Sequence, residues 1–248
     1  MAHALRPLTL GAAVFSRRVA LGVWIALLAF AFAPRAPAQT PRAAEQAGRF
    51  TVFSARPVAD LGFTPRAGAP RQPVVFYPTA RSPRYDYRSA MPLRFTDGPS
   101  GAVVASVTIP PDIRDALLLF TPIKPIPASS LRYQVAVLDD SALRHGAGAL
   151  MVINLSGLAL SGTVGNQDVT LTAGLNPPLA TASSAKIVLR TSAGGRTYQA
   201  YAGALQLKKN ERALLILFPP FYQGSHEVQS RLLVDDPTAA QVAVPAKK

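Results

Sequence analysis

The sequence predicts an all-β protein: two tandem immunoglobulin-like β-sandwich domains, related by an internal repeat of about 97 residues, after an N-terminal signal peptide. Three observations support this prediction. Residues 19–33 form an unbroken apolar run, the remaining chain consists of short apolar runs separated by turn residues, and the second half repeats the order of the first. The expected organisation is a signal peptide (1–38), a linker (39–48), a first β-sandwich domain (49–142), a linker (143–148), a second β-sandwich domain (149–238) and a basic tail (239–248).

The first 38 residues have the layout of a secretory signal. They contain four arginines and no acidic residue, and the apolar run is followed by the small-residue triplet Ala36-Pro37-Ala38. This order predicts cleavage before Gln39. A retained membrane anchor is the alternative, but a spanning helix needs about 20 apolar residues and Pro34 ends this run. Arg17-Arg18 leaves open whether export follows the Sec or the twin-arginine route.

Composition limits what the exported part can be. Removing the signal's four arginines lowers the formal net charge from +13 to +9, and 210 residues remain, enough for two ordinary domains. The chain has no cysteine, so its stability comes from apolar cores rather than from disulfides. Twenty-three prolines argue against long helices.

Short strands recur through the rest of the chain. Val107-Thr108-Ile109 and Leu205-Gln206-Leu207 alternate apolar and polar residues, as expected for a sheet with one buried face. Further strands are expected at 50–53, 73–77, 103–109, 116–120, 133–138, 150–155, 169–171, 186–189, 205–207, 214–218 and 228–234.

The internal repeat rests on matches in a fixed order. VTIPPDIRDALLLFTP (107–122) matches LQLKKNERALLILFPP (205–220) at an offset of 98, which pairs Arg114 with Arg212 and Leu117–Phe120 with Leu215–Phe218. TVFS (51–54) matches MVIN (151–154), and the pair Asp139-Asp140 matches Asp235-Asp236. The alternative is coincidence among similar strands.

Two of the matched strands are apolar on both pleat faces. We expect one of them, 117–120 or 214–218, to pack against the other domain. The connecting segment 143–148 contains Gly146 and Gly148, which suit a turn or hinge.

The polar residues give little support for catalysis or metal binding, so we expect no enzyme, cofactor or metal site. A catalytic triad could be drawn from Ser141, His145 and Asp139, but we do not expect it to form. No nucleophile elbow accompanies these residues, and His145 is expected in an exposed loop. His226 has no second histidine at ligand spacing.

The two Asp pairs are ambiguous. Asp139-Asp140 and Asp235-Asp236 each end an expected strand, where Asp accepts backbone N–H groups in a turn. Calcium binding is the alternative reading, because Ca²⁺ takes several carboxylate oxygens.

The basic segment 66–94 is the candidate binding surface. It carries six arginines, Arg66, Arg71, Arg81, Arg84, Arg88 and Arg94, against the single acid Asp86. Aromatic residues are interleaved with them, namely Phe76, Tyr77, Tyr85 and Tyr87, and Phe95 follows directly. Export disfavours nucleic acid as the partner and favours anionic envelope glycans, lipid headgroups or acidic protein surfaces. The alternative is a solvated loop with edge strands whose arginines deter edge pairing.

Together these features predict a non-enzymatic binding or structural protein of the cell envelope, periplasmic or extracellular, exported by a bacterium. Its partner would be an anionic envelope component or another exported protein. The layout is also similar to that of periplasmic pilus assembly chaperones, which have a cleaved signal, two immunoglobulin-like domains and a basic charge. No motif of that family is present in the sequence, so the similarity transfers no residue role.

Overall fold

The computed structural model describes residues 45–58, 60–124 and 126–238, and within them the chain forms strands, turns and loops but no helix. The expected signal peptide (1–38), most of the expected first linker and the expected tail (239–248) lie outside the described residues. No helix in the described ranges is therefore long and apolar enough to cross a membrane.

Seventeen strands follow one another along the described chain. Those of the N-terminal half are β1 (Glu45–Ser54), β2 (Leu61–Phe63), β3 (Gln72–Pro73), β4 (Tyr85–Ala90), β5 (Leu93–Asp97), β6 (Val103–Val107), β7 (Asp115–Pro122) and β8 (Tyr133–Asp139). Those of the C-terminal half are β9 (Ala149–Asn154), β10 (Leu160–Val164), β11 (Gln167–Leu171), β12 (Gly174–Leu175), β13 (Leu179–Ala180), β14 (Ser184–Ala193), β15 (Arg196–Gln206), β16 (Arg212–Pro220) and β17 (Val228–Asp235).

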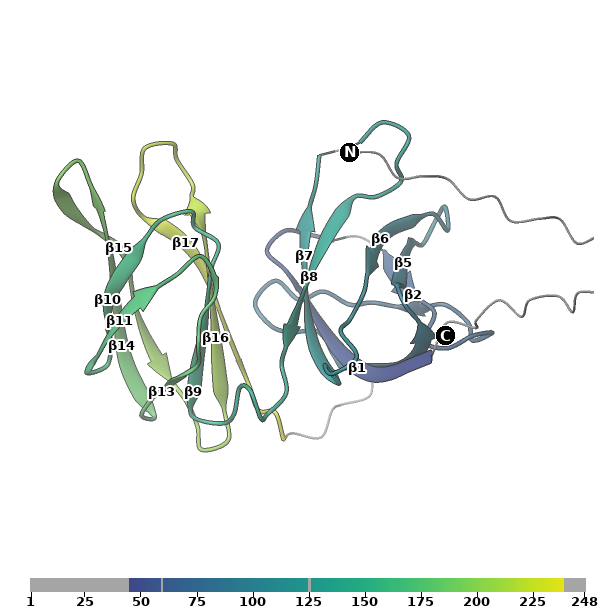
Figure 1. The fold of residues 1–248 in the computed structure, drawn as a ribbon, viewed down its shortest axis with the longest axis horizontal. Helices are drawn as coiled ribbons and strands as arrows, with labels where there is room; N and C mark the ends of the chain where they lie inside the picture. Colours follow the sequence, from purple (N-terminus) through teal and green to yellow (C-terminus); the bar gives the residue numbers. More distant parts are fainter. Residues whose placement is uncertain (1–44, 59, 125, 239–248) are drawn as a thin grey trace, which may run out of the picture. The chain divides into compact units, whose positions relative to one another are not determined.

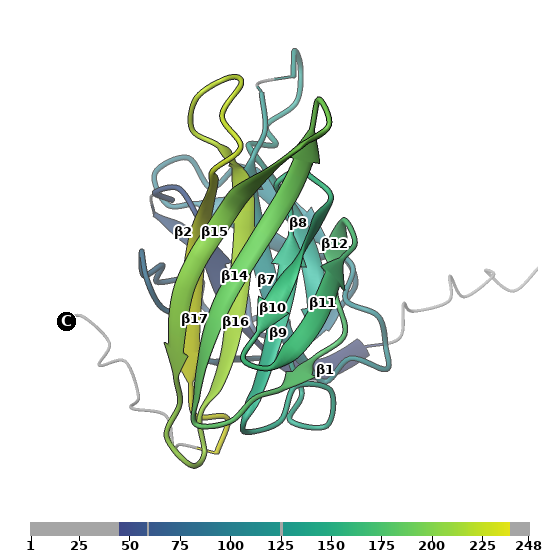
Figure 2. The same ribbon diagram turned by 90° about the vertical axis from the view of Figure 1, so that its left-hand side faces the viewer.

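The strands form four sheets, two in each half. In the N-terminal half, sheet A has the order β4-β1-β7-β8 and sheet B the order β3-β2-β5-β6. In the C-terminal half, sheet C has the order β12-β9-β16-β17, with β13 also paired to β9, and sheet D the order β11-β10-β14-β15. Figures 1 and 2 show sheets C and D as two layers. This all-β arrangement is consistent with a β-sandwich architecture.

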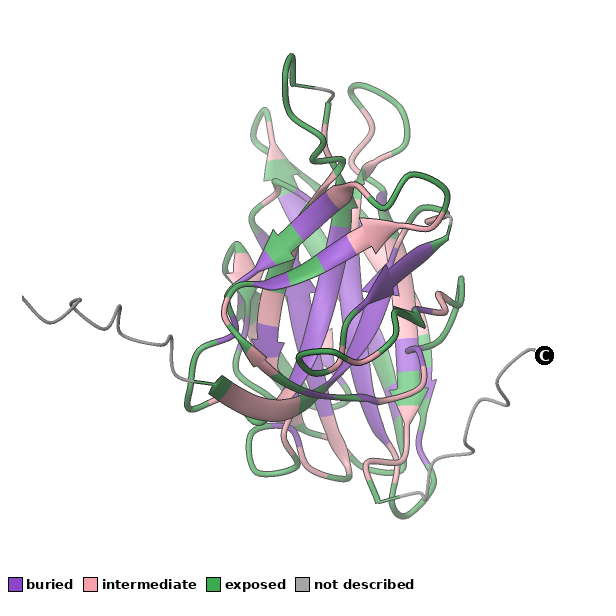
Figure 3. Cartoon of the chain, turned by 90° about the vertical axis from the view of Figure 1, so that its right-hand side faces the viewer, coloured by how far each residue is buried: buried purple, intermediate pink, exposed green. Residues whose placement is uncertain are grey.

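Pleat alternation explains how each half builds its own core. In β4, Tyr85 and Tyr87 are buried while Asp86 and Arg88 are exposed, because successive side chains point to opposite faces of a strand. Phe50, at the centre of the N-terminal core, lies edge-to-face against Phe63 and Phe95 with ring centroids 4.9 and 5.8 Å away. Figure 3 shows the buried stretches within the strands and the exposed ones largely in the loops.

Strands β7 and β16 are buried on both faces, as their sequences predict. Ala116, Leu118 and Phe120 belong to the N-terminal core, whereas Leu117 and Leu119 belong to a third apolar cluster. That cluster also contains Met151, Ile153, Leu214, Ile216 and Leu233 of the C-terminal half. The expectation that such a strand packs against the other half is therefore confirmed, and it applies to both strands.

The same alternation corrects the alignment at an offset of 98. Leu117 faces the third cluster, whereas Leu215 faces the core of its own half, so these two residues lie on opposite pleat faces. Arg114 is exposed and Arg212 is buried. The pairing of Leu117–Phe120 with Leu215–Phe218 is therefore wrong, because residues equivalent in a repeat would have to face the same way, which an even offset does not give here.

Several expected elements also differ from the structure. Strand β1 begins at Glu45, inside the expected linker 39–48, and residues 74–77 form no strand. The expected linker 143–148 belongs to a tight turn, in which the backbone N–H groups of Arg144 and His145 donate to Ser141 O over 3.1 and 2.9 Å. Gly148 has φ 73°, a left-handed conformation that favours glycine.

Candidate functional site

An open groove of about 880 Å³ runs beside β4, the edge strand of sheet A. Residues 65–73, which lead from β2 into β3, form one wall, and β4 together with Ala47 and Gly48 of β1 forms the other. The walls are joined where the backbone N–H of Arg88 donates to Pro65 O over 2.7 Å, and Arg66 and Arg88 form a parallel β-bridge. Four of the six predicted arginines line this groove: Arg66, Arg71, Arg84 and Arg88.

Two of these four arginines are engaged by the protein. Arg71 donates to Asp60 O over 2.8 Å and to Thr96 Oγ1 over 3.2 Å, and its Nη2 lies 3.6 Å from the Asp60 carboxylate. Arg84 donates from Nη2 to Pro237 O over 3.1 Å. Both side chains are thereby held by contacts within the protein.

The side chains of Arg66 and Arg88 have no hydrogen-bond or ion-pair partner in the described part of the chain. Among the described residues that line the groove, Asp86 is the only acidic one, and it lies opposite Arg49 in the register of β1 and β4. Its charge helps to raise the pKa of Arg49, after the larger effect of the hydrogen bond from Arg49 to Asp115. Like charges directly opposite each other in a sheet are destabilising, so an anion bound between Arg66 and Arg88 would relieve their repulsion.

The other predicted site residues lie elsewhere. Arg94 is exposed on β5, in sheet B, and lines a different surface depression. Tyr85, Tyr87 and Phe95 are core residues, and Phe76 packs against Phe120 at 5.2 Å between ring centroids. The aromatic side chains of Tyr85, Tyr87, Phe95 and Phe76 are therefore mainly structural.

Arg81 is not a surface residue, contrary to its predicted place in the basic patch. Its side chain is 5% exposed and pairs with Asp140 at 3.0 Å and with Asp235. The neighbouring Ser82 fixes this segment to β1, because Val52 N donates to Ser82 Oγ over 2.7 Å. Arg81 thus links the N-terminal half to the end of β17.

A buried ionic cluster surrounds Arg81 and was not foreseen from the sequence. Arg212, whose side chain is 1% exposed, donates to Asp140 Oδ2 over 3.0 Å and to Asp235 Oδ2 over 3.1 Å. It also donates to the carbonyl oxygens of Asp140 and His145 over 2.8 and 2.9 Å. The signal for this cluster was a lone Arg at the start of an apolar strand, which requires a partner if it is buried.

The ionisation of Asp140 is set by this cluster. Burial by itself would raise its pKa, but the charges of Arg81 and Arg212 and the ring of His145 outweigh burial and hold the pKa below its usual range. His145 Nδ1 lies 3.7 Å from Asp140 Oδ1, while Nε2 lies 2.9 Å from Ala213 O. Asp140 is therefore a buried carboxylate shared by Arg81 and Arg212.

The predicted exposed position of His145 is wrong, because its side chain is fully buried in this cluster. The triad on paper is not assembled either: the ring faces Asp140 rather than Asp139, and Ser141 contacts His145 only through the backbone. His226 instead stacks on Tyr198 at 4.2 Å between ring centroids. No group of three or more His, Cys, Asp or Glu among the described residues is placed to hold a metal ion.

The Asp pairs divide their roles. Asp139 Oδ1 accepts from Ser141 N over 3.0 Å, and Asp236 Oδ1 accepts from Thr238 N over 2.7 Å, so these two residues form the turns that the sequence suggests. Asp140 and Asp235 instead pair with the buried arginines. Each pair thus supplies one residue to a turn and one to the ion pairs with the buried arginines.

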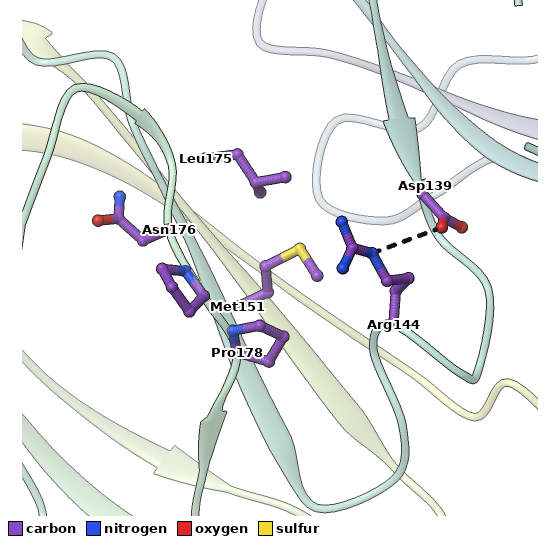
Figure 4. A pocket seen from close by; sticks show the side chains of 7 residues that line it. Asp139, Arg144, Met151, Leu175, Asn176 and Pro178 are labelled. Atoms are coloured by element: carbon purple, nitrogen blue, oxygen red, sulfur yellow. Dashed lines mark ion pairs between the residues drawn. The ribbon is translucent and has the colours of Figure 1, made fainter. Parts of the chain in front are cut away.

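A smaller pocket of about 290 Å³ lies where β8 and the turn after it approach β9 and β12. Figure 4 shows the Asp139–Arg144 ion pair on one side and Met151, Leu175 and Pro178 on the other. The ion pair is 3.7 Å long and Arg144 is largely exposed. Its lining carries no free pair of like charges comparable to that in the groove.

No family model matches this chain, and no curated protein matches it significantly.

Proposed function

We propose that this chain is an exported, non-enzymatic binding protein of the bacterial cell envelope that holds an anionic partner in the groove beside β4. The observation that carries the proposal is the convergence of Arg66, Arg71, Arg84 and Arg88 on one groove whose only acid is Asp86. Export is inferred from the signal-like layout of residues 1–38.

We further propose that residues 49–142 and 149–238 are two copies of one immunoglobulin-like sandwich. The sheet orders support this, since β4-β1-β7-β8 corresponds to β12-β9-β16-β17 and β3-β2-β5-β6 to β11-β10-β14-β15. In both halves the first strand also runs parallel to the next-to-last one. The corresponding register pairs are Phe50 with Ala116 and Leu150 with Ala213, which gives offsets of 100 and 97.

The contact between the two halves supports the proposed binding role. If the halves are copies, the third apolar cluster joins equivalent faces of the two sandwiches. With an offset of 97 residues, Leu117 corresponds to Leu214 and Leu119 to Ile216. Because this cluster and the ionic cluster both join the halves, the groove is presented on a firmly held pair of domains. A rigid scaffold favours binding because little conformational freedom is lost on association.

A periplasmic assembly chaperone remains the second candidate, favoured by the two-sandwich layout. Such a protein would engage its client mainly through sheet edges and apolar contacts, which depend little on salt. Anion binding in the groove would instead weaken strongly as salt shortens the Debye length from about 10 Å at 0.1 M to about 3 Å at 1 M.

The test is binding of the purified protein to anionic envelope polymers at these two salt concentrations. The variant R66S/R88S should lose most of the binding, whereas R94S/R190S, which removes the same charge from exposed positions outside the groove, should retain it. Equal binding by both variants would refute the groove as the site. If the protein binds an exported subunit equally well at both salt concentrations, and if the R66S/R88S variant still binds it, the chaperone function is favoured.

A further inference from the structure

The two unpaired arginines restrict the kind of anion that fits the groove. Arg66 and Arg88 are directly paired in a parallel bridge, and residues paired in this way carry their side chains on the same face, about 4.8 Å apart along the hydrogen-bonding direction. Both side chains line the groove. Two guanidinium groups therefore start side by side and are available to one ligand group.

No carboxylate among the described residues makes an ion pair with Arg66 or Arg88. Asp86, two residues before Arg88 on the same face of β4, offsets part of their charge, while Arg49 opposite it pairs with Asp115. Arg71 and Arg84 already donate to protein oxygens. Arg66 and Arg88 are thus the two arginines of the groove whose donors have no protein partner.

The donor geometry distinguishes between anions. One guanidinium fork is enough to pair with both oxygens of a carboxylate, so a carboxylate leaves the second arginine unmatched. A phosphoryl group carries several tetrahedrally arranged oxygens and accepts hydrogen bonds from two guanidinium groups at once. A phosphate monoester also carries a charge of about −1.5 to −2 at pH 7, which balances two arginines better than a diester, a sulfate ester or a carboxylate does.

We propose that the groove binds a phosphate monoester group, held between Arg66 and Arg88. This inference rests on the proposed anion-binding function. Pro65, Pro70 and Pro73 occupy much of the wall and have no backbone N–H to donate, so the groove recognises the phosphoryl group more than the molecule that bears it. The monoester is therefore carried by an envelope polymer or by a lipid headgroup.

The experiment is calorimetric titration of the full chain, purified from the envelope, with glycerol 2-phosphate at low salt. We expect binding at pH 7.5 that R88S weakens about tenfold or more, since a charge-assisted hydrogen bond contributes about 1.5–3 kcal/mol. At pH 5 the affinity should fall, because the phosphate dianion takes up one proton near pH 6 and becomes a monoanion, while the arginines keep their charge. R94S is the matched control and should bind as the parent does.

R66K/R88K keeps the charge but removes both forks, and it should bind more weakly than the parent if the forks matter. Competition by a phosphorylated polysaccharide or by vesicles containing phosphatidic acid then identifies the source of the monoester. If oligogalacturonate binds in an Arg88-dependent manner and glycerol 2-phosphate does not compete, the phosphate assignment is wrong although the anion-binding function stands. If neither ligand binds and envelope polymers bind the parent and R66S/R88S alike, both proposals fail.

Discussion

Replacing Arg212 by Met tests whether the buried ionic cluster holds the structure together. The substitution keeps an unbranched side chain but removes the hydrogen bonds that Arg212 donates to Asp140, to Asp235 and to the carbonyl oxygen of His145. Asp140, whose side chain is 7% exposed, would keep only Arg81 and the ring of His145 as neighbours of opposite or variable charge. Two backbone carbonyl oxygens would also lose their donor.

The expected loss follows from the burial of the partners. Removing one member of a buried pair typically costs about 3–5 kcal/mol, because the remaining charge is uncompensated. The Asp235 side chain is 24% exposed, so water partly replaces the hydrogen bonds that it loses from Arg212. The loss in the free energy of unfolding should therefore lie in the lower half of this range. Because a domain's total stability is typically about 5–15 kcal/mol, the loss is easily measured.

The measurement is urea unfolding at pH 7 followed by far-UV circular dichroism, since the only tryptophan lies at position 24. Arg190→Met, an exposed change of the same type on β14, should shift stability by no more than about 0.5 kcal/mol. In the double variant R212M/D140N the stranded charge is removed, so part of the loss should be recovered. A cost below about 1 kcal/mol for R212M would show that the cluster does not stabilise the fold.

Three further outcomes are expected. Because the folded protein lowers the pKa of Asp140, its stabilising contribution is fully present above the usual Asp pKa of about 3.9, declines below it and is lost as pH falls through the lowered pKa. Urea midpoints at pH 7 and pH 3 should therefore differ less in D140N than in the parent. Leu214→Ala should lower the free energy of unfolding by about 2–5 kcal/mol, as for other buried leucines, and should cause the two halves to unfold in separate transitions. A single cooperative transition with an unchanged midpoint would contradict the role assigned to the third apolar cluster. N-terminal sequencing of protein from the envelope should begin at Gln39, and a sequence that begins at Met1 would rule out cleavage.

Local sequence pattern predicted much of the fold. Runs such as 116–120 and 214–218 are too apolar for a strand with one solvated face, and this alone indicated that both faces would be covered. The strands at 61–63 and 160–164 were missed because they are short and carry glycine or serine. The matched segments 51–54 and 151–154 lie at corresponding places in the register of sheets A and C.

The sequence by itself determined that the chain is built of strands, that segment 66–94 is basic, and that β7 and β16 need cover on both faces. Only the tertiary structure decided which arginines share a surface. Arg81 and Asp235 are 154 positions apart, and their pairing depends on how the two halves meet, which no local pattern encodes. Arg66 and Arg88 meet for the same reason, because a loop folds back along the edge of β4. Side-chain alternation is a property of a few neighbouring residues, whereas the partner of a charge depends on the whole chain path.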